Sequence, residues 1–302
     1  MSRPQHTAVR PTITAAQRRI GGREFDFDRR AAVMAIVNRT RDSFFDDGRT
    51  YDLQPAVDAA LAAIEAGADI VDVGGVPFSP IAREVSESEE IDLIVGFVEE
   101  VLSQAPTAVL SVDTFRSAVA GAAVGAGAAI INDTSGLADP ALAEVAAKSG
   151  ATIVITHSKA VPRTLLPSPR YDDVVREVSE FLSLRVQQAV DAGVTPAQLI
   201  VDPGPDLNKN TLHTLEIVRR FDEFARLGPP LLAALSNKDF VGETVDRPKR
   251  ERLPGTLVAT AWCLERGARI VRAHDVAATV DAVRMAEALL GLREPTNLRH
   301  NI

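Results

Sequence analysis

The sequence predicts one α/β domain folded as an eight-stranded (β/α)8 barrel. Eight apolar, β-branched runs recur along the chain, and a segment with helical spacing follows each of them. Gly67, Gly127, Gly150 and Gly267 each fall just after a helical segment and just before a strand, where a left-handed residue commonly ends a helix. The eight units occupy most of the chain, which suits a fold that typically needs ~250 residues. A doubly wound sheet is the alternative, but it offers no reason for such even spacing.

The individual elements follow from these patterns. Residues 1–20 are expected to be a flexible leader, and residues 21–27 alternate like a short hairpin covering one end of the barrel, so the folded domain is expected to span 21–302. Pro55 in a first turn, and Ser86 followed by Glu89, mark two helix starts. The barrel strands are expected at 33–38, 69–73, 108–112, 129–132, 151–156, 199–202, 231–235 and 269–272.

Composition argues against several classes of protein. Hydrophobic residues make up 46% of the 302 positions, enough to bury a large core. The formal net charge of −8 supplies no basic surface for a phosphate backbone, so we expect no nucleic-acid partner. The single cysteine, Cys263, cannot form an internal disulfide. No stretch has the ~20 apolar residues of a membrane span, and residues 1–30 lack a signal-peptide core, so we expect a cytoplasmic protein without membrane contact.

Most of the strand-like runs stop on a polar cluster. In a (β/α)8 barrel the carboxyl ends of all strands meet at one rim, so these clusters are expected to line one pocket. Several have a structural alternative. Asp113-Thr114 could cap a helix starting at Phe115, and Asp275 could cap the last helix. Asp202 to Gly204 and Asn132 to Gly136 could be ordinary turns, and His157 could be a satisfied buried histidine. The clusters are Asn38, Gly74-Gly75, Asp113, Asn132-Asp133, His157, Asp202, Ser236 to Lys238 and Arg272 to Asp275.

The polar clusters suggest a ligand by their chemistry. Two acids, an amide and a lysine at one partly buried rim would be costly without a ligand to pair with them. These residues are Asp113, Asn132, Asp202 and Lys238. Ionised carboxylates only accept hydrogen bonds and so favour a planar ligand edge with several N–H donors, while lysine donates to a carbonyl or a ring nitrogen. Arg272 with His274 suits an anion. The residues therefore suggest phosphate or pyrophosphate beside a donor-rich heterocycle.

An ordered series of motifs makes the chain resemble the dihydropteroate synthase family along nearly all of residues 33–290. The motifs are Asn38 to Phe44, Ser111 to Thr114, Ile131 to Asp133, Asp202 to Gly204, Ser236 to Lys238 and Arg272 to Asp275. These enzymes displace pyrophosphate from 6-hydroxymethyl-7,8-dihydropterin pyrophosphate with the amine of p-aminobenzoate, through a transition state with cationic character at the pterin methylene. The resemblance implies a pterin ligand, Mg²⁺ bound with the pyrophosphate, and a homodimer formed through the later barrel helices.

The resemblance also implies a role for each matching residue. Asp202 and Asn132 would read the aminopyrimidinone edge of the pterin, Asp113 would face its reduced ring, and Lys238 its carbonyl side. Asn38, Arg272 and His274 would hold the pyrophosphate, with Asn38 acting through Mg²⁺. Asp113, Lys238 and Asp46 would take part in catalysis. Such roles make physical sense, because a leaving pyrophosphate needs its charge neutralised and nearby carboxylates stabilise a methylene cation.

The departures from the family fall on the acceptor half of the site. Val76, Pro77, Phe78 and Ser79 replace Glu-Ser-Thr-Arg, so the threonine and arginine of the p-aminobenzoate pocket are missing. The other changes are Asp206-Leu207-Asn208 for Gly-Phe-Gly, Asn237 for arginine, Asp239 for serine, Thr156 for methionine, and Arg39 and Arg41 for valine and proline. Arg83 could supply the missing charge from further along the loop.

These changes predict weak or absent dihydropteroate synthesis, since losing a charge-assisted contact to a carboxylate costs about 1.5–3 kcal/mol. The pattern at residues 236–239 and 241–244 resembles the divergent second copies that some actinobacteria carry beside a true synthase. Two other interpretations stay open. One is a catalytically silent pterin-binding or regulatory protein; the other is a pterin-dependent methyltransferase, which would leave Arg272 and His274 without an anion.

Overall fold

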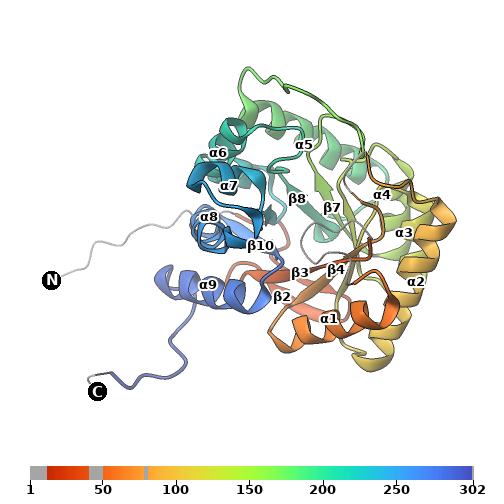
Figure 1. Cartoon of the computed structure of the whole chain (residues 1–302), viewed down its shortest axis with the longest axis horizontal. Helices are drawn as coiled ribbons and strands as arrows, with labels where there is room; N and C mark the ends of the chain where they lie inside the picture. Colours follow the sequence, from red (N-terminus) through yellow and green to blue (C-terminus); the bar gives the residue numbers. More distant parts are fainter. Residues whose placement is uncertain (1–11, 41–49, 78–80, 301–302) are drawn as a thin grey trace.

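Eight parallel strands close into a barrel in chain order, and β10 pairs with β3 to complete the ring (Figure 1). The computed structural model describes residues 12–40, 50–77 and 81–300. The predicted fold class is confirmed, and the doubly wound alternative is wrong because a doubly wound sheet keeps two open edges. The strands are β3 (Ala32–Asn38), β4 (Ile70–Gly74), β5 (Leu110–Asp113), β6 (Ile130–Asp133), β7 (Thr152–Thr156), β8 (Leu199–Asp202), β9 (Leu231–Ala234) and β10 (Ala268–Ala273).

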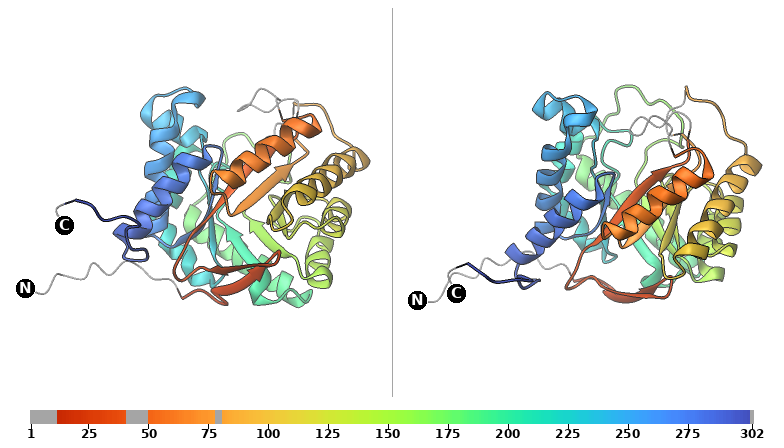
Figure 2. Two further views of the ribbon diagram at one scale, coloured as in Figure 1. Left: turned by 90° about the horizontal axis from the view of Figure 1, so that it is seen from below. Right: turned by 60° about the horizontal axis from the view of Figure 1, so that its bottom comes forward.

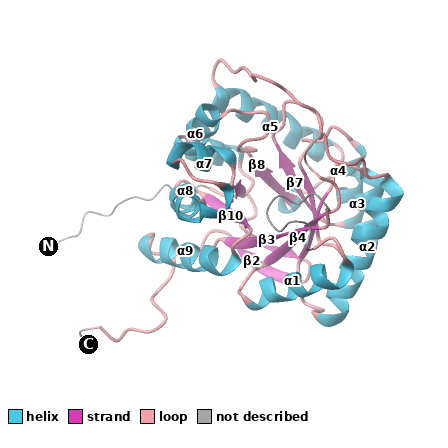
Figure 3. Cartoon of the chain, in the orientation of Figure 1, coloured by secondary structure: helices cyan, strands magenta, loops and turns pink. Residues whose placement is uncertain are grey.

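Helices form a layer around the barrel (Figure 3). The four glycines expected to end helices adopt positive φ, at 100°, 117°, 79° and 98° for Gly67, Gly127, Gly150 and Gly267. Ser86 caps its helix as predicted by accepting from the Glu89 N–H. The helices are α1 (Leu53–Glu65), α2 (Glu87–Gln104), α3 (Ser117–Gly125), α4 (Ala141–Ser149), α5 (Val174–Asp191), α6 (Thr211–Arg219), α7 (Asp239–Val245), α8 (Leu253–Glu265) and α9 (Val276–Leu289), with 3-10 turns η1 (Pro196–Gln198), η2 (Phe221–Leu227) and η3 (Lys249–Glu251).

Side chains along each strand alternate between the barrel interior and the helical layer. In β7, Val154 belongs to the apolar cluster that fills the barrel, whereas Ile153 and Ile155 belong to the cluster between the strands and the helices. Met34 and Ile200 lie in the interior cluster as well. This period of two means that residue parity alone tells which side chains at a strand end face the mouth of the barrel.

A two-stranded hairpin closes the amino-terminal end of the barrel (Figure 2). It consists of β1 (Gln17–Ile20) and β2 (Arg23–Asp26), so its first strand lies inside the segment predicted as a leader, and the predicted leader boundary is corrected. Two features anchor that strand. Ile20 is buried in the interior cluster, and the guanidinium of Arg18 donates to the carbonyls of Ala197 and Leu199 at 2.9 Å. Burial lowers the pKa of Arg18 to about 10.

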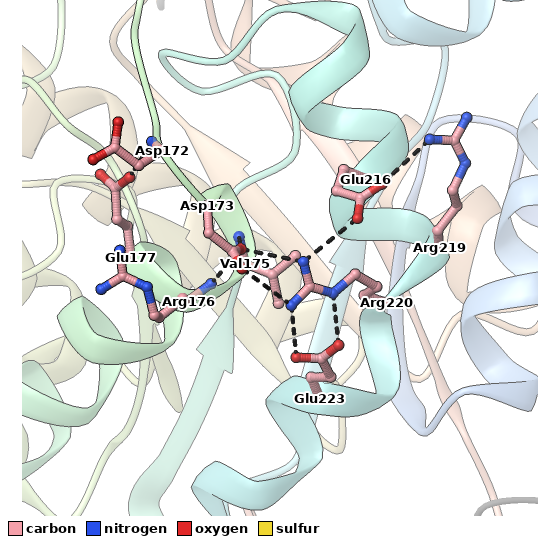
Figure 4. A network of polar contacts seen from close by, with 9 residues as sticks. All are labelled: Asp172, Asp173, Val175, Arg176, Glu177, Glu216, Arg219, Arg220 and Glu223. Carbon is pink, nitrogen blue, oxygen red and sulfur yellow. Dashed lines mark hydrogen bonds and ion pairs between the residues drawn. The ribbon is translucent and has the colours of Figure 1, made fainter.

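A cluster of ion pairs fixes the end of the long loop between β7 and α5 (Figure 4). Asp173 caps α5 by accepting from the N–H groups of Val175 and Arg176. Arg220 pairs with the same carboxylate at 3.2 Å and with both oxygens of Glu223 at 2.6 and 3.0 Å. The loop that leads from the barrel mouth to α5 is therefore tied at its far end to α6 and η2.

Within the described ranges, none of the helices is both long enough and apolar enough to cross a membrane.

Candidate functional site

One arginine bridges two carboxylates at the mouth of the barrel. Arg272 on β10 donates from Nε to Asp72 Oδ2 at 2.6 Å and from Nη2 to Asp113 Oδ2 at 3.1 Å. Asp72 is fully buried and also accepts from Ser111 Oγ at 2.6 Å and Asn132 Nδ2 at 3.0 Å. The four elements β4, β5, β6 and β10 thus present one connected set of polar groups on the inner face.

Asp113 has an environment suited to a change of protonation. Burial raises its pKa to about 7, while Arg272 opposes the rise and the neighbouring carboxylate of Asp72 adds to it. One guanidinium cannot fully neutralise two buried carboxylates. The helix-cap alternative for Asp113 is wrong, because α3 begins at Ser117, whose N–H donates to Asp139.

The opposite side of the mouth carries Asp202 and two lysines. Asp202 accepts from the Gly204 N–H at 2.8 Å, so it forms the predicted turn while remaining on the inward parity of β8. Burial raises its pKa and the Lys238 charge opposes that rise, whereas burial lowers the pKa of Lys238. Lys238 Nζ donates to the carbonyl of Pro205 at 2.6 Å. An acid and an ammonium are therefore held close together without a direct ion pair among the described contacts.

Lys209 and His157 contact each other next to the turn that follows Asp202. Lys209 Nζ donates to the carbonyls of Gly204 and Leu207 at 2.8 and 2.9 Å, and it lies 2.8 Å from His157 Nδ1. Burial, with help from the Lys209 charge, lowers the pKa of His157 to about 2, so the ring is neutral and Nδ1 accepts. Burial also lowers the pKa of Lys209 well below its ordinary value. The prediction of His157 as a satisfied buried histidine is confirmed.

The residues expected to hold pyrophosphate come from β3 and β10. His274 Nδ1 lies 2.9 Å from Ser236 Oγ, and the His274 N–H donates to the same oxygen at 3.2 Å. Asn38 ends β3 on the inward parity, and its carbonyl accepts from Thr50 Oγ1. Arg272 is paired with Asp72 and Asp113 as described, so an anion would have to share or displace those contacts. Asp275 occupies the N-cap position of α9, as the cap alternative predicts, although its side chain makes no cap hydrogen bond.

Part of the altered acceptor half lies within the described residues. Pro77 is buried, Val76 and Leu207 are partly buried, and Asp46, Phe78 and Ser79 lie outside the described residues. Asn237, which replaces an arginine, has φ of 55°, a left-handed conformation that asparagine tolerates. Its N–H donates to Thr256 Oγ1 at 3.1 Å, and its carbonyl accepts from Arg252, which links this turn to α8.

Three loops on this side are joined by what we term the acceptor-loop network. Asn208 Oδ1 accepts from Ser158 Oγ at 2.8 Å and from the Ala160 N–H at 2.9 Å. Further along the same loop, Arg163 donates to the carbonyls of Pro77 at 3.1 Å and Ala82 at 2.6 Å. The β8–α6, β7–α5 and β4–α2 loops are therefore held together where the sequence departs from the family.

Two arginines near the altered loops are engaged elsewhere. Arg83 forms a two-pronged pair with Glu89 at 2.6 and 2.9 Å, so the suggestion that it supplies the missing acceptor charge is not supported. Arg39 is buried and donates to the carbonyls of Tyr51 and Leu93, which ties the base of the first loop to α2.

Fold and site together define a barrel protein with an acidic, cation-bridged cluster of side chains at the carboxyl ends of its strands. The chain belongs to the pterin binding enzyme family, whose profile matches residues 34–274.

The curated relatives include synthases and proteins described as inactive. The chain is 45% identical to "Inactive dihydropteroate synthase 2" of Mycobacterium tuberculosis (strain H37Rv) over 272 residues, which cover 88% of this chain and 85% of the relative. It is 37% identical to "Dihydropteroate synthase" of Escherichia coli (strain K12) over 262 residues, which cover 87% of this chain and 93% of the relative. The chain is thus similar both to synthases and to proteins described as inactive versions of them.

Solved structures give the same picture. Dihydropteroate synthase of Xanthomonas albilineans with 4-aminobenzoic acid superimposes with a TM-score of 0.83 at 37% identity, covering 91% of this chain and 98% of that one. The Yersinia pestis enzyme in a sulfonamide drug complex gives a TM-score of 0.86 at 35% identity, covering 92% of this chain and all of that one (100%). The chain is a dihydropteroate synthase-like barrel.

Sequence reasoning missed two site residues. Asp72 sits in the middle of an apolar strand, where no strand-end motif points to it; its signal is a charged residue on the inward parity of β4. Lys209 follows Asp206-Leu207-Asn208 in the β8–α6 loop, where no motif points to it. The short distance from Asp202 to Lys209 along the chain was the available signal, since a buried acid needs a nearby cation.

Proposed function

We propose that this protein binds a dihydropterin pyrophosphate-type ligand at the barrel mouth, and that it makes dihydropteroate slowly or not at all. The observation that carries the proposal is the convergence of Asp113, Asn132, Asp202 and Lys238 on one inner face. Carboxylates and an amide oxygen match the N–H donors of an aminopyrimidinone edge, and burial strengthens such bonds. Family membership and the synthase-like fold support the same ligand class.

The pyrophosphate would lie beside Asn38, Arg272 and His274. The amide oxygen of Asn38 is a suitable hard ligand for Mg²⁺, which commonly takes one or two protein oxygens and completes its shell with phosphate and water. The described ranges contain no group of three His, Cys, Asp or Glu residues that could hold a metal on their own, so the ion would arrive with the phosphate. Bound there, Mg²⁺ would neutralise charge on the departing pyrophosphate.

The acceptor half supports the low activity. Arg163, which comes close to this half of the site, is engaged with the backbone carbonyls of Pro77 and Ala82 in the acceptor-loop network. The relatives described as inactive point the same way. A catalytically silent pterin-binding protein is the second candidate, and the pairing of Arg272 with Asp72 and Asp113 favours it, because the anion site is engaged by the protein itself.

We also propose a homodimer through α8 and α9. Four large apolar side chains are exposed on these helices, which lie side by side (Figure 1); they are Val258 at 71%, Trp262 at 44%, Met285 at 59% and Leu289 at 76% exposure. Exposed apolar side chains grouped on one face commonly mark an interface. Sedimentation velocity measures the mass, and a monomer at micromolar concentration would contradict the proposal.

Calorimetry with 6-hydroxymethyl-7,8-dihydropterin pyrophosphate tests the binding proposal. Asp202→Ala should abolish binding, because it removes the acid that faces the ligand edge, whereas Asp191→Ala at the exposed end of α5 should leave affinity unchanged. Equal affinity in wild type and Asp202→Ala would refute the pterin assignment. Turnover with p-aminobenzoate separates the two candidates: slow product formation supports the weak synthase, and its complete absence supports the silent binder.

A further inference from the structure

Thr156, the last residue of β7, buries a hydroxyl that has no hydrogen-bond partner. The residue is 1% exposed, and among the described side chains only its Oγ1 and Glu90 Oε1 are buried without a partner. A buried, unpaired polar group costs about 1–3 kcal/mol. Valine has the same shape and would avoid that penalty, so the hydroxyl calls for an explanation.

The strand register places this hydroxyl at the ligand site. Thr156 shares its parity with Val154, which points into the barrel, and it pairs in register with Asp202 on β8. Its methyl group is directed toward the β8–α6 turn, because a Cβ built at Gly204 would lie 3.3 Å from Thr156 Cγ2. Oγ1 is the other branch of this inward-facing side chain, and Thr156 is the neighbour of Asp202 in the strand register.

The other unpaired atom has a different setting. Glu90 lies in the first turns of α2, and its second oxygen pairs with Arg116 at 2.7 Å. Arg116 also donates to the carbonyl of Val85, so this group of contacts joins α2 to the start of α3. Glu90 is accounted for by packing between helices, whereas Thr156 has neither a charged partner nor a backbone partner.

We infer that the Thr156 hydroxyl is a specificity-determining contact that donates a hydrogen bond to the bound pteridine, an inference that rests on the proposed function. An ionised carboxylate can only accept, so it cannot satisfy a ring carbonyl or an unprotonated ring nitrogen. A hydroxyl beside Asp202 adds a neutral donor at the edge that this acid reads. The methionine that the family has at this position offers no such donor, so the ligand preferred here is a pteridine with a hydrogen-bond acceptor at that edge.

The test compares three variants in calorimetry with 6-hydroxymethyl-7,8-dihydropterin. Thr156→Val keeps the shape and removes the donor, and it should weaken binding about ten-fold, which is about 1.4 kcal/mol. Thr156→Ser restores the donor and should bind within about two-fold of wild type. Thr152→Val lies on the same strand and parity at the opposite end of the barrel, and it should leave affinity unchanged.

Thermal melting of the ligand-free proteins provides a second measurement. Thr156→Val should melt at the same or a higher temperature than wild type, because the unpaired hydroxyl is gone. Wild-type binding with unchanged affinity in Thr156→Val would overturn this inference and leave the proposed function standing. Absence of binding by the wild-type protein would overturn the proposed function itself.

Discussion

The perturbation Asp72→Asn tests whether the charge bridge at the barrel mouth holds the fold together. The substitution keeps the shape of the side chain but removes the charge that Arg272 Nε and Asn132 Nδ2 contact at 2.6 and 3.0 Å. Breaking a buried ion pair by removing one partner costs about 3–5 kcal/mol. Arg272 retains Asp113, and its side chain is 18% exposed, so we expect the lower end of that range, a loss of about 3 kcal/mol in the free energy of unfolding.

Urea denaturation of five proteins measures this effect. They are the wild type, Asp72→Asn, Arg272→Met and the double variant, with Asp58→Asn on the exposed face of α1 as a control for loss of one acidic charge. The double-mutant cycle should give a coupling energy of about 2 kcal/mol between Asp72 and Arg272, within the range seen for contacting residues. Additive losses, or a loss below about 1 kcal/mol in Asp72→Asn, would show that the charge bridge contributes little to the stability of the folded state.

Two further predictions concern Asp113 and Asn208. Because the folded state raises the pKa of Asp113 from 3.8 to about 7, the stability that its neutral form contributes is fully present below pH 4 and is lost as pH rises through about 7. The free energy of unfolding, measured by denaturation from pH 4 to 8, should therefore decline with pH, and the decline should be shallower in Asp113→Asn. If NMR showed the Asp113 carboxyl group titrating near pH 4, the prediction would be wrong. Asn208→Gly should speed hydrogen exchange in residues 158–163 and lower the free energy of unfolding by about 1 kcal/mol. Glycine readily adopts the left-handed φ of 51° at this position, but it lacks the side-chain oxygen that accepts from Ser158 and Ala160. Unchanged exchange would show that the acceptor-loop network does not order that loop.

Local pattern was enough to predict the barrel. The apolar runs and the glycines that follow the helices depend on nearest neighbours along the chain, and the strand bounds agree with the predicted ranges to within two residues. The hairpin was placed too late, because the alternation of Gln17–Ile20 is short and its partners at Ala197 and Leu199 lie far along the chain. Asp113, Asn132 and Asp202 lie at the carboxyl ends of β5, β6 and β8, which a closed parallel barrel brings to one rim, and Lys238 follows β9 as the N-cap of α7.

The fold class, the family likeness and the rim that carries the polar side chains can all be derived from the amino-acid sequence. The pairing of those side chains becomes visible only in the folded barrel. Asp72 and Arg272 are 200 positions apart and meet because β10 closes against β3, which no local pattern encodes. The register between β7 and β8 likewise decided that Thr156 stands beside Asp202. The alternation of side chains along a strand predicts the face on which each side chain lies. Its hydrogen-bond partners depend on the shear and closure of the whole barrel.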